Sequence, residues 1–151
     1  MSNPRSADRL SVRVGMADYN SVRPTYNALM PVVAVIGAST DRHKFGNKAL
    51  RAFRKHGDIV VPIHPRAAEV EGERAYASVL DYPGAIDEAT VYLPPAVGLG
   101  VMDEIAKKGI KIVWLNPGAD GPEVIARARA LGLTTHVACS IVGIGENPGR
   151  Y

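Results

Sequence analysis

VVAVIGASTDRHKFGN, residues 32–47, carries the strongest structural signal in the chain. A continuous apolar run stops at a Gly-Ala-Ser turn, and basic residues then lead into a segment with a helical pattern. Such a turn brings bare backbone N–H groups and a helix N-terminus to one point beyond the strand, which is how proteins hold phosphate. The stretch predicts a strand, a phosphate-binding turn and a helix, and therefore a nucleotide-like ligand.

The rest of the chain repeats this alternation of short apolar runs and helical segments. The β-branched runs that we predict to be strands are residues 32–36, 59–63, 89–93, 112–115 and 134–138. The runs VVAVI, IVVPI and KIVWL are apolar on both faces. This is typical of parallel strands that helices cover on each side. We therefore predict a Rossmann-like α/β fold with a doubly wound, mainly parallel five-stranded sheet in three α/β/α layers. Right-handed crossovers would place all the strand ends along one ligand-binding edge.

Glycine marks the ends of three predicted helices. Gly57, Gly109 and Gly132 each follow a helical segment and precede a strand. We expect them in the left-handed conformation that terminates a helix. Asp120 and Pro122 are expected to open the last of these helices, as N-cap and early-turn residues.

The helix predicted after the third strand has an apolar stripe. Val97, Val101 and Ile105 recur at every fourth position, which indicates a face packed in the core. Gly98 and Gly100 each cost about 1 kcal/mol of helix stability relative to Ala. Close packing against the sheet or a ligand is the explanation that we expect for them.

Length and composition indicate one domain. With 151 residues and 46% hydrophobic content, the chain can bury a sizeable core. Residues 1–30 are polar without sustained periodicity, so we predict an N-terminal arm there and a single domain over residues 31–151. No apolar run approaches the roughly 20 residues of a membrane span, and no signal peptide is visible, so we expect a cytoplasmic protein without membrane contact. The net charge of +3 includes no block of like charges and does not indicate nucleic acid as a partner.

The first turn departs from the dinucleotide fingerprint G-x-G-x-x-G. Gly37 occupies its first position, but Ser39 and Arg42 stand where the next two glycines belong. The next glycine is Gly46, so the loop is longer and more polar than usual. The Ser39 hydroxyl and the cations of the loop, Lys44 among them, suit a pyrophosphate. A solvated basic loop without a ligand is the alternative interpretation.

The second strand runs into His64, Pro65 and Arg66. The carboxylate that accepts the ribose hydroxyls in NAD-binding folds is missing at this point. A cation here suits a phosphorylated ribose, as in NADP or coenzyme A. Pro65 is explained equally well as a residue that stiffens the loop.

The third and fourth strand ends add further candidates. Leu93, Pro94 and Pro95 form a flat apolar wall suited to an adenine ring or a pantetheine stem, although Pro95 is also a natural first residue of a helix. The amide of Asn116 and the permissive backbone of Gly118 suit ligand contacts. Turn chemistry alone explains these two residues equally well.

No catalytic set is visible. His43, His56, His64 and His136 lie in separate elements, and none has a second His or a Cys at metal-ligand spacing. We find no G-x-S-x-G elbow, Walker lysine motif or Cys-His pairing. Cys139, the only cysteine, follows the fifth strand, where it either meets a thiol-bearing cofactor or is buried and inert. We expect no metal site and prefer a binding protein to an enzyme.

Six separated motifs occur in order: IGAST at 36–40, KFGN at 44–47, PIHPR at 62–66, EGERAYASVLDYP at 71–83, LPP at 93–95 and VWLNPG at 113–118. Together they resemble the small stand-alone CoA-binding proteins. Those proteins are similar to the N-terminal domain of the succinyl-CoA synthetase alpha subunit and of ADP-forming acyl-CoA synthetases. The resemblance covers about residues 31–142.

The resemblance implies a CoA site. In it, Gly37, Ala38 and Ser39 hold the CoA phosphates, Lys44 and Arg66 add positive charge, and the LPP motif borders the nucleotide. The complete set of cofactor-binding residues that we predict is Gly37, Ala38, Ser39, Lys44, Gly46, Asn47, His64, Pro65, Arg66, Leu93, Pro94, Pro95, Asn116, Pro117 and Gly118.

In the synthetases the phosphorylated histidine lies in a following domain, so the resemblance implies a module and not the whole enzyme. We expect a small non-catalytic protein that binds coenzyme A or acyl-CoA, or an accessory subunit, assembled as a homo-oligomer or with a partner enzyme. One alternative is an NAD(P)-binding oxidoreductase or nucleotide-sensing regulator that uses the same cleft. Another is a purely structural interaction domain.

Overall fold

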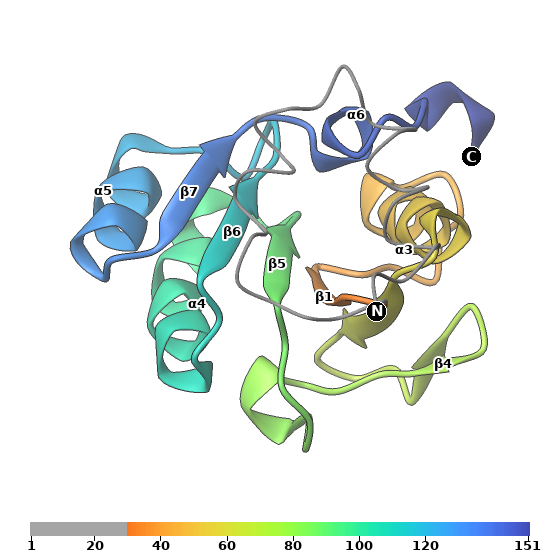
Figure 1. The fold of residues 1–151 in the computed structure, drawn as a ribbon, viewed down its shortest axis with the longest axis horizontal. Helices are drawn as coiled ribbons and strands as arrows, with labels where there is room; N and C mark the ends of the chain where they lie inside the picture. The colour runs from red at the N-terminus through yellow and green to blue at the C-terminus, as the bar shows by residue number, and fades with distance from the viewer. Residues whose placement is uncertain (1–29) are drawn as a thin grey trace, which may run out of the picture.

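The computed structural model describes residues 30–151, so nearly all of the predicted N-terminal arm lies outside the described residues. The described chain forms a five-stranded sheet with helices on both faces and a separate two-stranded hairpin (Figure 1). Its elements are β1 (Val32–Ile36), α3 (Phe45–His56), β2 (Ile59–Ile63), β3 (Glu69–Val70), β4 (Glu73–Arg74), the 3₁₀ turn η1 (Val79–Asp81), β5 (Glu88–Val91), α4 (Pro95–Lys108), β6 (Ile112–Leu115), α5 (Pro122–Ala130), β7 (Thr134–Val137), α6 (Ser140–Gly143) and the 3₁₀ turn η2 (Pro148–Arg150).

All strands of the main sheet run parallel, in the order β2-β1-β5-β6-β7. Ile36 at the end of β1 lies opposite Ile63 of β2 on one side and Val91 of β5 on the other. The chain therefore adds β2 on one side of β1 and then crosses to the other side to form β5. This reversal creates a switch point at the carboxyl ends of β1 and β5, where ligands bind in such sheets. The predicted doubly wound parallel sheet is confirmed.

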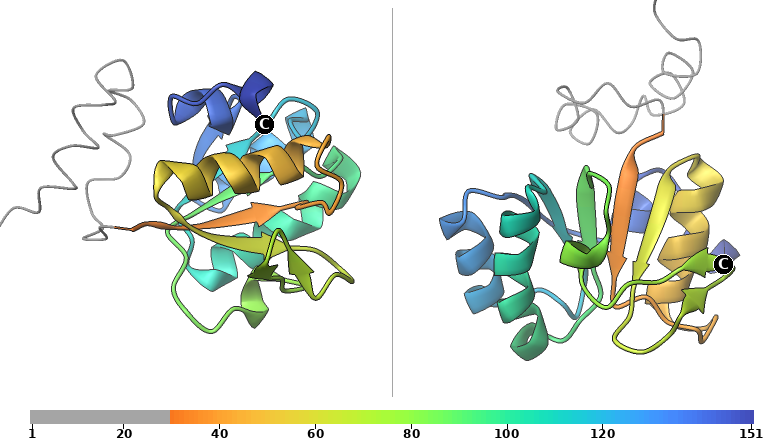
Figure 2. Two further views of the ribbon diagram at one scale, coloured as in Figure 1. Left: turned by 90° about the vertical axis from the view of Figure 1, so that its right-hand side faces the viewer. Right: turned by 90° about the horizontal axis from the view of Figure 1, so that it is seen from below.

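The sheet separates two apolar cores because successive strand residues face opposite sides. Val33 and Val35 of β1 belong to a cluster that includes Phe53 of α3. Ala34 and Ile36 belong to a second cluster, built with α4 and α5. Figure 2 shows α3 on one side of the sheet and α4 and α5 on the other. This arrangement gives the three predicted layers.

The helix ends follow the sequence signals. Gly57, Gly109 and Gly132 have positive φ angles of 101°, 89° and 78°, as predicted for glycines that terminate helices. Among residues 30–151, no helix is both long enough and apolar enough to cross a bilayer.

Asp120 does not have its predicted role. The N-cap of α5 is Gly121, one residue later. The Asp120 carboxylate instead accepts the Gly118 N–H at 3.0 Å, within the preceding turn. Asp120 is therefore a turn residue, because its side chain reaches back along the chain and not forward into the helix.

The glycines of α4 are not explained by close packing. A Cβ placed on Gly98 or Gly100 would meet no heavy atom of the surrounding described chain within 4 Å. The prediction that close packing against the sheet requires these glycines was wrong, while packing against a ligand, the other explanation, stays a prediction.

The segment between β2 and β5 contains structure that the sequence analysis did not predict. Residues 69–74 form the β3-β4 hairpin, and η1 begins at a capping box in which Ser78 and Asp81 bond each other's backbone. Tyr76 makes an isolated parallel bridge with Ile63 at the end of β2. The segment therefore touches the carboxyl edge of the sheet at Tyr76 and returns to the amino edge by Asp87, whose N–H donates to the Val32 carbonyl at 2.9 Å.

Candidate nucleotide-binding site

Two glycines bring the start of α3 against the turn that follows β1. Gly37 has a φ of 89°, and a Cβ at this position would lie 3.0 Å from the backbone carbonyl of Tyr92. A Cβ at Gly46 would lie 2.1 Å from the Gly37 carbonyl oxygen, far inside contact distance. Glycine at both positions therefore lets the first turn, the helix and the chain after β5 meet.

The N-terminus of α3 has no side-chain cap. Its N-cap residue, Lys44, is exposed and makes no capping hydrogen bond, and the first turn contains no acidic residue. The first N–H groups of the helix and the positive end of its dipole are therefore left for an anion. The ammonium group of Lys44 adds positive charge near this helix end.

Local turns shape residues 39–43. Ser39 Oγ accepts the Asp41 N–H at 3.0 Å, and the Asp41 carboxylate accepts the His43 N–H at 2.9 Å. This bond from His43, with smaller contributions from the charges of His43 and Lys44, holds the pKa of Asp41 below its ordinary value. The hydroxyl hydrogen of Ser39 takes no part in these bonds and is left to donate to a ligand.

Asn47 is fully buried and holds this loop from inside. Its amide donates to the Ser39 carbonyl at 2.9 Å and to the Glu71 carboxylate at 3.1 Å, and its side-chain oxygen accepts from Arg51 at 2.7 Å. The bond from Asn47, followed by the charge of Arg42 with its Nε 2.9 Å from Oε1, holds the pKa of Glu71 below its ordinary value. Asn47 therefore positions the turn through bonds within the protein.

His64 organises the turn at the end of β2. Its Nδ1 accepts the N–H groups of Arg66 at 3.0 Å and of Ala67 at 2.8 Å, so this nitrogen is occupied within the protein. The side chains of Pro65 and Arg66 are exposed on the same turn. His64 thus fixes the backbone that carries a cation at the end of β2.

A groove of about 260 Å³ lies between the start of α3 and the ends of β5 and β6. Lys44, Phe45 and Gly46 line it from α3, and residues 92–94 and 117–119 line it from the strand ends. Phe45 is 52% exposed although it is aromatic, and the sequence analysis did not single it out. The groove therefore combines uncapped helix N–H groups with apolar surface.

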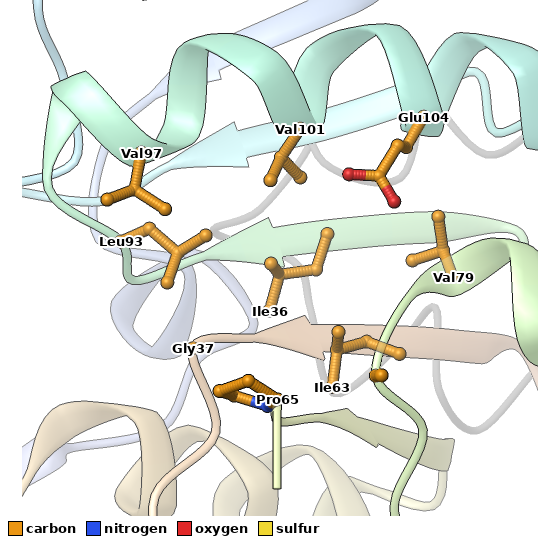
Figure 3. A pocket seen from close by; sticks show the side chains of 10 residues that line it. Ile36, Gly37, Ile63, Pro65, Val79, Leu93, Val97, Val101 and Glu104 are labelled. Carbon is orange, nitrogen blue, oxygen red and sulfur yellow. The ribbon is translucent and has the colours of Figure 1, made fainter.

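A second cavity, of about 190 Å³ and mostly apolar, lies beside the groove (Figure 3). Gly37 and Leu93 line both, so the two spaces meet at the switch point. The cavity is lined by side chains from the ends of β1 and β2, from residues 77–79 and from α4. Val97, which the sequence analysis expected in the core, is 55% exposed and lines this cavity with Val101. That prediction was wrong for Val97 because the first turn of α4 lies at the carboxyl edge of the sheet, beyond the end of β5.

Asn116 is buried in a polar network that joins three elements. Its amide donates to Thr90 Oγ1 at 2.7 Å and to the Val91 carbonyl at 2.9 Å, and its oxygen accepts the Ser140 N–H at 2.8 Å. Its polar atoms are thus engaged inside the protein, contrary to the expectation that its amide is free to contact a ligand. The Tyr92 hydroxyl lies 3.1 Å from Ser140 Oγ, and burial raises the pKa of Tyr92 to about 12.

The structure gathers about half of the predicted binding residues on the walls of the two spaces. These are Gly37, Lys44, Gly46, Pro65, Leu93, Pro94, Pro117 and Gly118. The others lie beside the walls or behind them: Ala38, Ser39, Asn47, His64, Arg66, Pro95 and Asn116. Ala38 packs in the core, and Pro95 begins α4 against Gly121.

The fold and the site define a class of protein. It is a parallel α/β domain with a candidate ligand site at the switch point of its sheet, where an uncapped helix N-terminus adjoins a glycine turn. A family model described as a CoA binding domain matches residues 31–150. The chain belongs to this CoA-binding domain family.

Individual relatives agree with this assignment. The alpha subunit of ADP-forming acetate–CoA ligase II from Pyrococcus furiosus is 36% identical over 95 residues, which cover 60% of this chain and 21% of the subunit. A hypothetical protein from Pyrococcus horikoshii OT3 has a TM-score of 0.74 and 27% identity, over 84% of this chain and 87% of that one. The apo dinucleotide forming acetyl-coenzyme A synthetase 1 of Ca. Korarchaeum cryptofilum has a TM-score of 0.61 and 31% identity, over 69% of this chain and 25% of that one.

The resemblance stated from the motifs is therefore confirmed. This chain is homologous to a part of the ADP-forming ligases, and it spans about a fifth of the length of the Pyrococcus furiosus subunit.

Proposed function

We propose that this protein binds coenzyme A or acyl-CoA as a small non-catalytic module or accessory subunit. The observation that carries the proposal is the junction at Gly37 and Leu93, where a groove beside an uncapped helix meets an apolar cavity. Coenzyme A likewise has two parts that meet at one point, because its pyrophosphate joins the adenosine to the pantetheine arm.

The pyrophosphate is assigned to the first turn. The backbone N–H groups of Ala38 and Ser39, the Ser39 hydroxyl and the N-terminus of α3 supply neutral donors, whereas the Gly37 N–H already donates to the Ile63 carbonyl at 3.3 Å. Lys44 supplies the charge. Gly46 serves this site by allowing the helix to approach, since a Cβ there would strike the Gly37 carbonyl.

The adenosine is assigned to the apolar cavity and the turn after β2. An adenine ring entering between Leu93 and Val97 would lie against aliphatic side chains, while the ribose would lie near Pro65. Arg66, which is exposed on the same turn as Pro65 and donates its backbone N–H to His64, is the candidate partner of the ribose 3′-phosphate.

The pantetheine arm is assigned to the groove. Its path would lead from the first turn between Phe45 and Pro94 toward Pro117 and Gly118. Gly118 has a φ of 93° and an exposed backbone, which suits contact with the amide groups of the arm. An acyl group on the thiol would extend beyond these residues.

In the acetate–CoA ligase relatives, the segment that matches this chain makes up 21% and 11% of the whole protein. We propose that the chain supplies a CoA site to a partner enzyme or to a second copy of itself, and that ligase chemistry is not its own.

Thermal denaturation in the presence of CoA, dephospho-CoA, NAD and NADP tests the binding proposal. A ligand at 100 times its dissociation constant adds about 2.7 kcal/mol to the free energy of unfolding. We expect the largest rise in Tm with CoA and a smaller rise with dephospho-CoA, which lacks the 3′-phosphate. We expect little effect of NAD because the β2 turn offers no carboxylate to the ribose hydroxyls. A larger rise with NADP than with CoA, or no rise with millimolar CoA, would contradict the proposal.

A further inference from the structure

Glu104 stands out among the described residues that line the apolar cavity, since it is the only one with a polar side chain. Figure 3 shows its carboxylate directed from α4 into the cavity, between Val101 and Val79. The site described so far gives this carboxylate no role. A carboxylate at the wall of an apolar space is costly unless it is hydrogen-bonded.

One oxygen of this carboxylate is already held. Ser78 donates its hydroxyl to Glu104 Oε1, and Ser78 Oγ accepts the Leu80 N–H at 3.1 Å. The single hydroxyl proton of Ser78 therefore goes to Glu104, which fixes the carboxylate against the start of η1. Oε2 accepts no hydrogen bond from the described residues 30–151, so it is left as an acceptor for a group inside the cavity.

The α4 wall of the cavity carries two apolar side chains followed by an acceptor. Val97, Val101 and Glu104 lie at i, i+4 and i+7 and so share one face of α4. The rise of a helix places Glu104 about 10 Å beyond Val97 along its axis. A planar ring that enters beside Leu93 and Val97 would therefore have apolar walls along its faces and one hydrogen-bond acceptor ahead of it.

On the basis of the proposed CoA binding, we propose that Glu104 reads the adenine base by accepting a hydrogen bond from its exocyclic amino group. An apolar cavity alone discriminates weakly between rings of similar size. A fixed acceptor rejects a ring without the amino group much more strongly, because the acceptor is then left unpaired. Glu104 is thus a specificity-determining residue, and Ser78 positions it.

The test compares CoA with its analogue in which the purine carries hydrogen in place of the amino group. Dissociation constants are measured by calorimetry for the unaltered protein and for Glu104→Gln, Glu104→Leu and Ser78→Ala. The unaltered protein should bind CoA about tenfold or more tighter than the analogue. In Glu104→Gln the amide oxygen accepts from Ser78, so its NH₂ group faces the adenine amino group as donor against donor, and the preference should fall to about one or reverse.

Two further variants separate base reading from loop structure. Glu104→Leu removes the acceptor without adding a donor, and it should also bring the preference to about one. Ser78→Ala keeps the carboxylate but removes its tether and the acceptor of the Leu80 N–H, so the Tm without ligand should fall and the preference for CoA should be weakened but not abolished. Tm values measured without ligand verify that each variant is folded.

The outcomes distinguish this inference from the proposed function. Equal binding of CoA and the analogue by the unaltered protein would overturn the role of Glu104 while leaving CoA binding in place. The role of Glu104 would also be overturned if Glu104→Gln kept the full preference for CoA. The same holds if the preference were lost in Ser78→Ala but kept in both Glu104 variants. Failure of the unaltered protein to bind CoA would refute the proposed function itself.

Discussion

Gly46 shows how a single missing side chain shapes the site. It lies in the first turn of α3, where a Cβ would lie 2.1 Å from the Gly37 carbonyl oxygen and 3.3 Å from the Ala38 Cα. Both of these atoms belong to the backbone of the turn after β1, which has no flexible end that can move aside. The helix therefore reaches the turn only because residue 46 is glycine.

We predict that Gly46→Ala lowers the free energy of unfolding by about 1–3 kcal/mol through overpacking. It should also weaken CoA binding, since the helix N-terminus must move away from the turn. Gly100→Ala in α4 is the matched control, because a Cβ there meets nothing and the exchange should stabilise the helix by up to about 1 kcal/mol. Denaturant unfolding and CoA titration of both variants check this, and equal effects of the two exchanges would contradict it.

Arg66 is the residue through which the 3′-phosphate is tested. We predict that Arg66→Ala weakens CoA binding about threefold to tenfold and changes dephospho-CoA binding little, because only CoA presents the phosphate. Arg129→Ala removes the same charge from the exposed surface of α5 and serves as the control. Calorimetric titration gives the constants. Equal losses for the two ligands would reject the contact.

Two asparagines show that a sequence motif does not decide whether a polar side chain contacts a ligand. Asn47 and Asn116 were both predicted as ligand contacts, and both are buried with their amides bonded inside the protein. In the sequence, an asparagine beside a glycine turn looks the same whether its amide contacts a ligand or bonds inside the protein. The difference lies in partners such as Glu71 and Ser140, which are 24 residues away in the chain in each case.

At the level of elements, a buried polar network joins the ends of β5 and β6 to the start of α6. Thr90 Oγ1 lies 2.7 Å from Ser140 Oγ and receives the amide of Asn116 at 2.7 Å. The network lies behind the strand ends that line the groove, so it holds two of the loops of the site at a set spacing. Fully paired networks of this kind are rigid, and they are costly to break.

We predict that Asn116→Ala lowers the free energy of unfolding by about 2–4 kcal/mol, because three hydrogen bonds are lost and their buried partners are left unpaired. Asn147→Ala is the control, since Asn147 makes one bond to the Gly149 N–H near the surface and should cost about 1 kcal/mol. Urea unfolding monitored by circular dichroism measures both. Similar losses in the two variants would contradict the network's role.

The hairpin β3-β4 marks the limit of element prediction. Each strand has two residues, which is too short for the alternation by which strands are predicted. The hairpin is anchored through tertiary contacts, as Arg54 of α3 donates to the Glu71 carbonyl at 2.7 Å. The five long strands, in contrast, were predicted within two residues at each end because their apolar runs are local and continuous.

For the molecule as a whole, the crossing from β2 to β5 places the site. It brings the turn after β1 and the chain after β5 together, and Gly37 fits against the Tyr92 carbonyl at their junction. Tyr92 belongs to the polar network and to the groove wall, so its ionisation couples the stability of the fold to pH.

Burial raises the pKa of Tyr92 to about 12, above its ordinary value of 10.0, because the folded protein disfavours the charged phenolate. Its contribution to stability is fully present below about pH 10 and is lost as the pH rises toward about 12. We predict that Tyr92→Phe loses about 1 kcal/mol at neutral pH with the bond to Ser140, but loses less further stability than the unaltered protein between about pH 9 and about pH 11.

Tyr151 is the control for this experiment, because its pKa is also raised to about 12, by burial and by its bond to Glu146, while it lies at the end of the chain. Urea unfolding of Tyr92→Phe, Tyr151→Phe and the double variant across this pH range separates the two groups. An unchanged alkaline loss in Tyr92→Phe would show that Tyr92 does not titrate as described.

The alternation of strands and helices, the parallel sheet and the turns that face the ligand edge could be read from the amino acids alone. These features arise from apolar runs, glycines and cations that are close together in the chain, so local sequence specifies them. Only the folded structure decided which of these side chains bond inside the protein and which line the cavity. Asn47 and Asn116 face inward, Val97 lines a cavity, and Glu104 is directed into it. Each of these outcomes depends on pairing and packing between segments distant in sequence, where the same residue type meets water in one place and a buried partner in another.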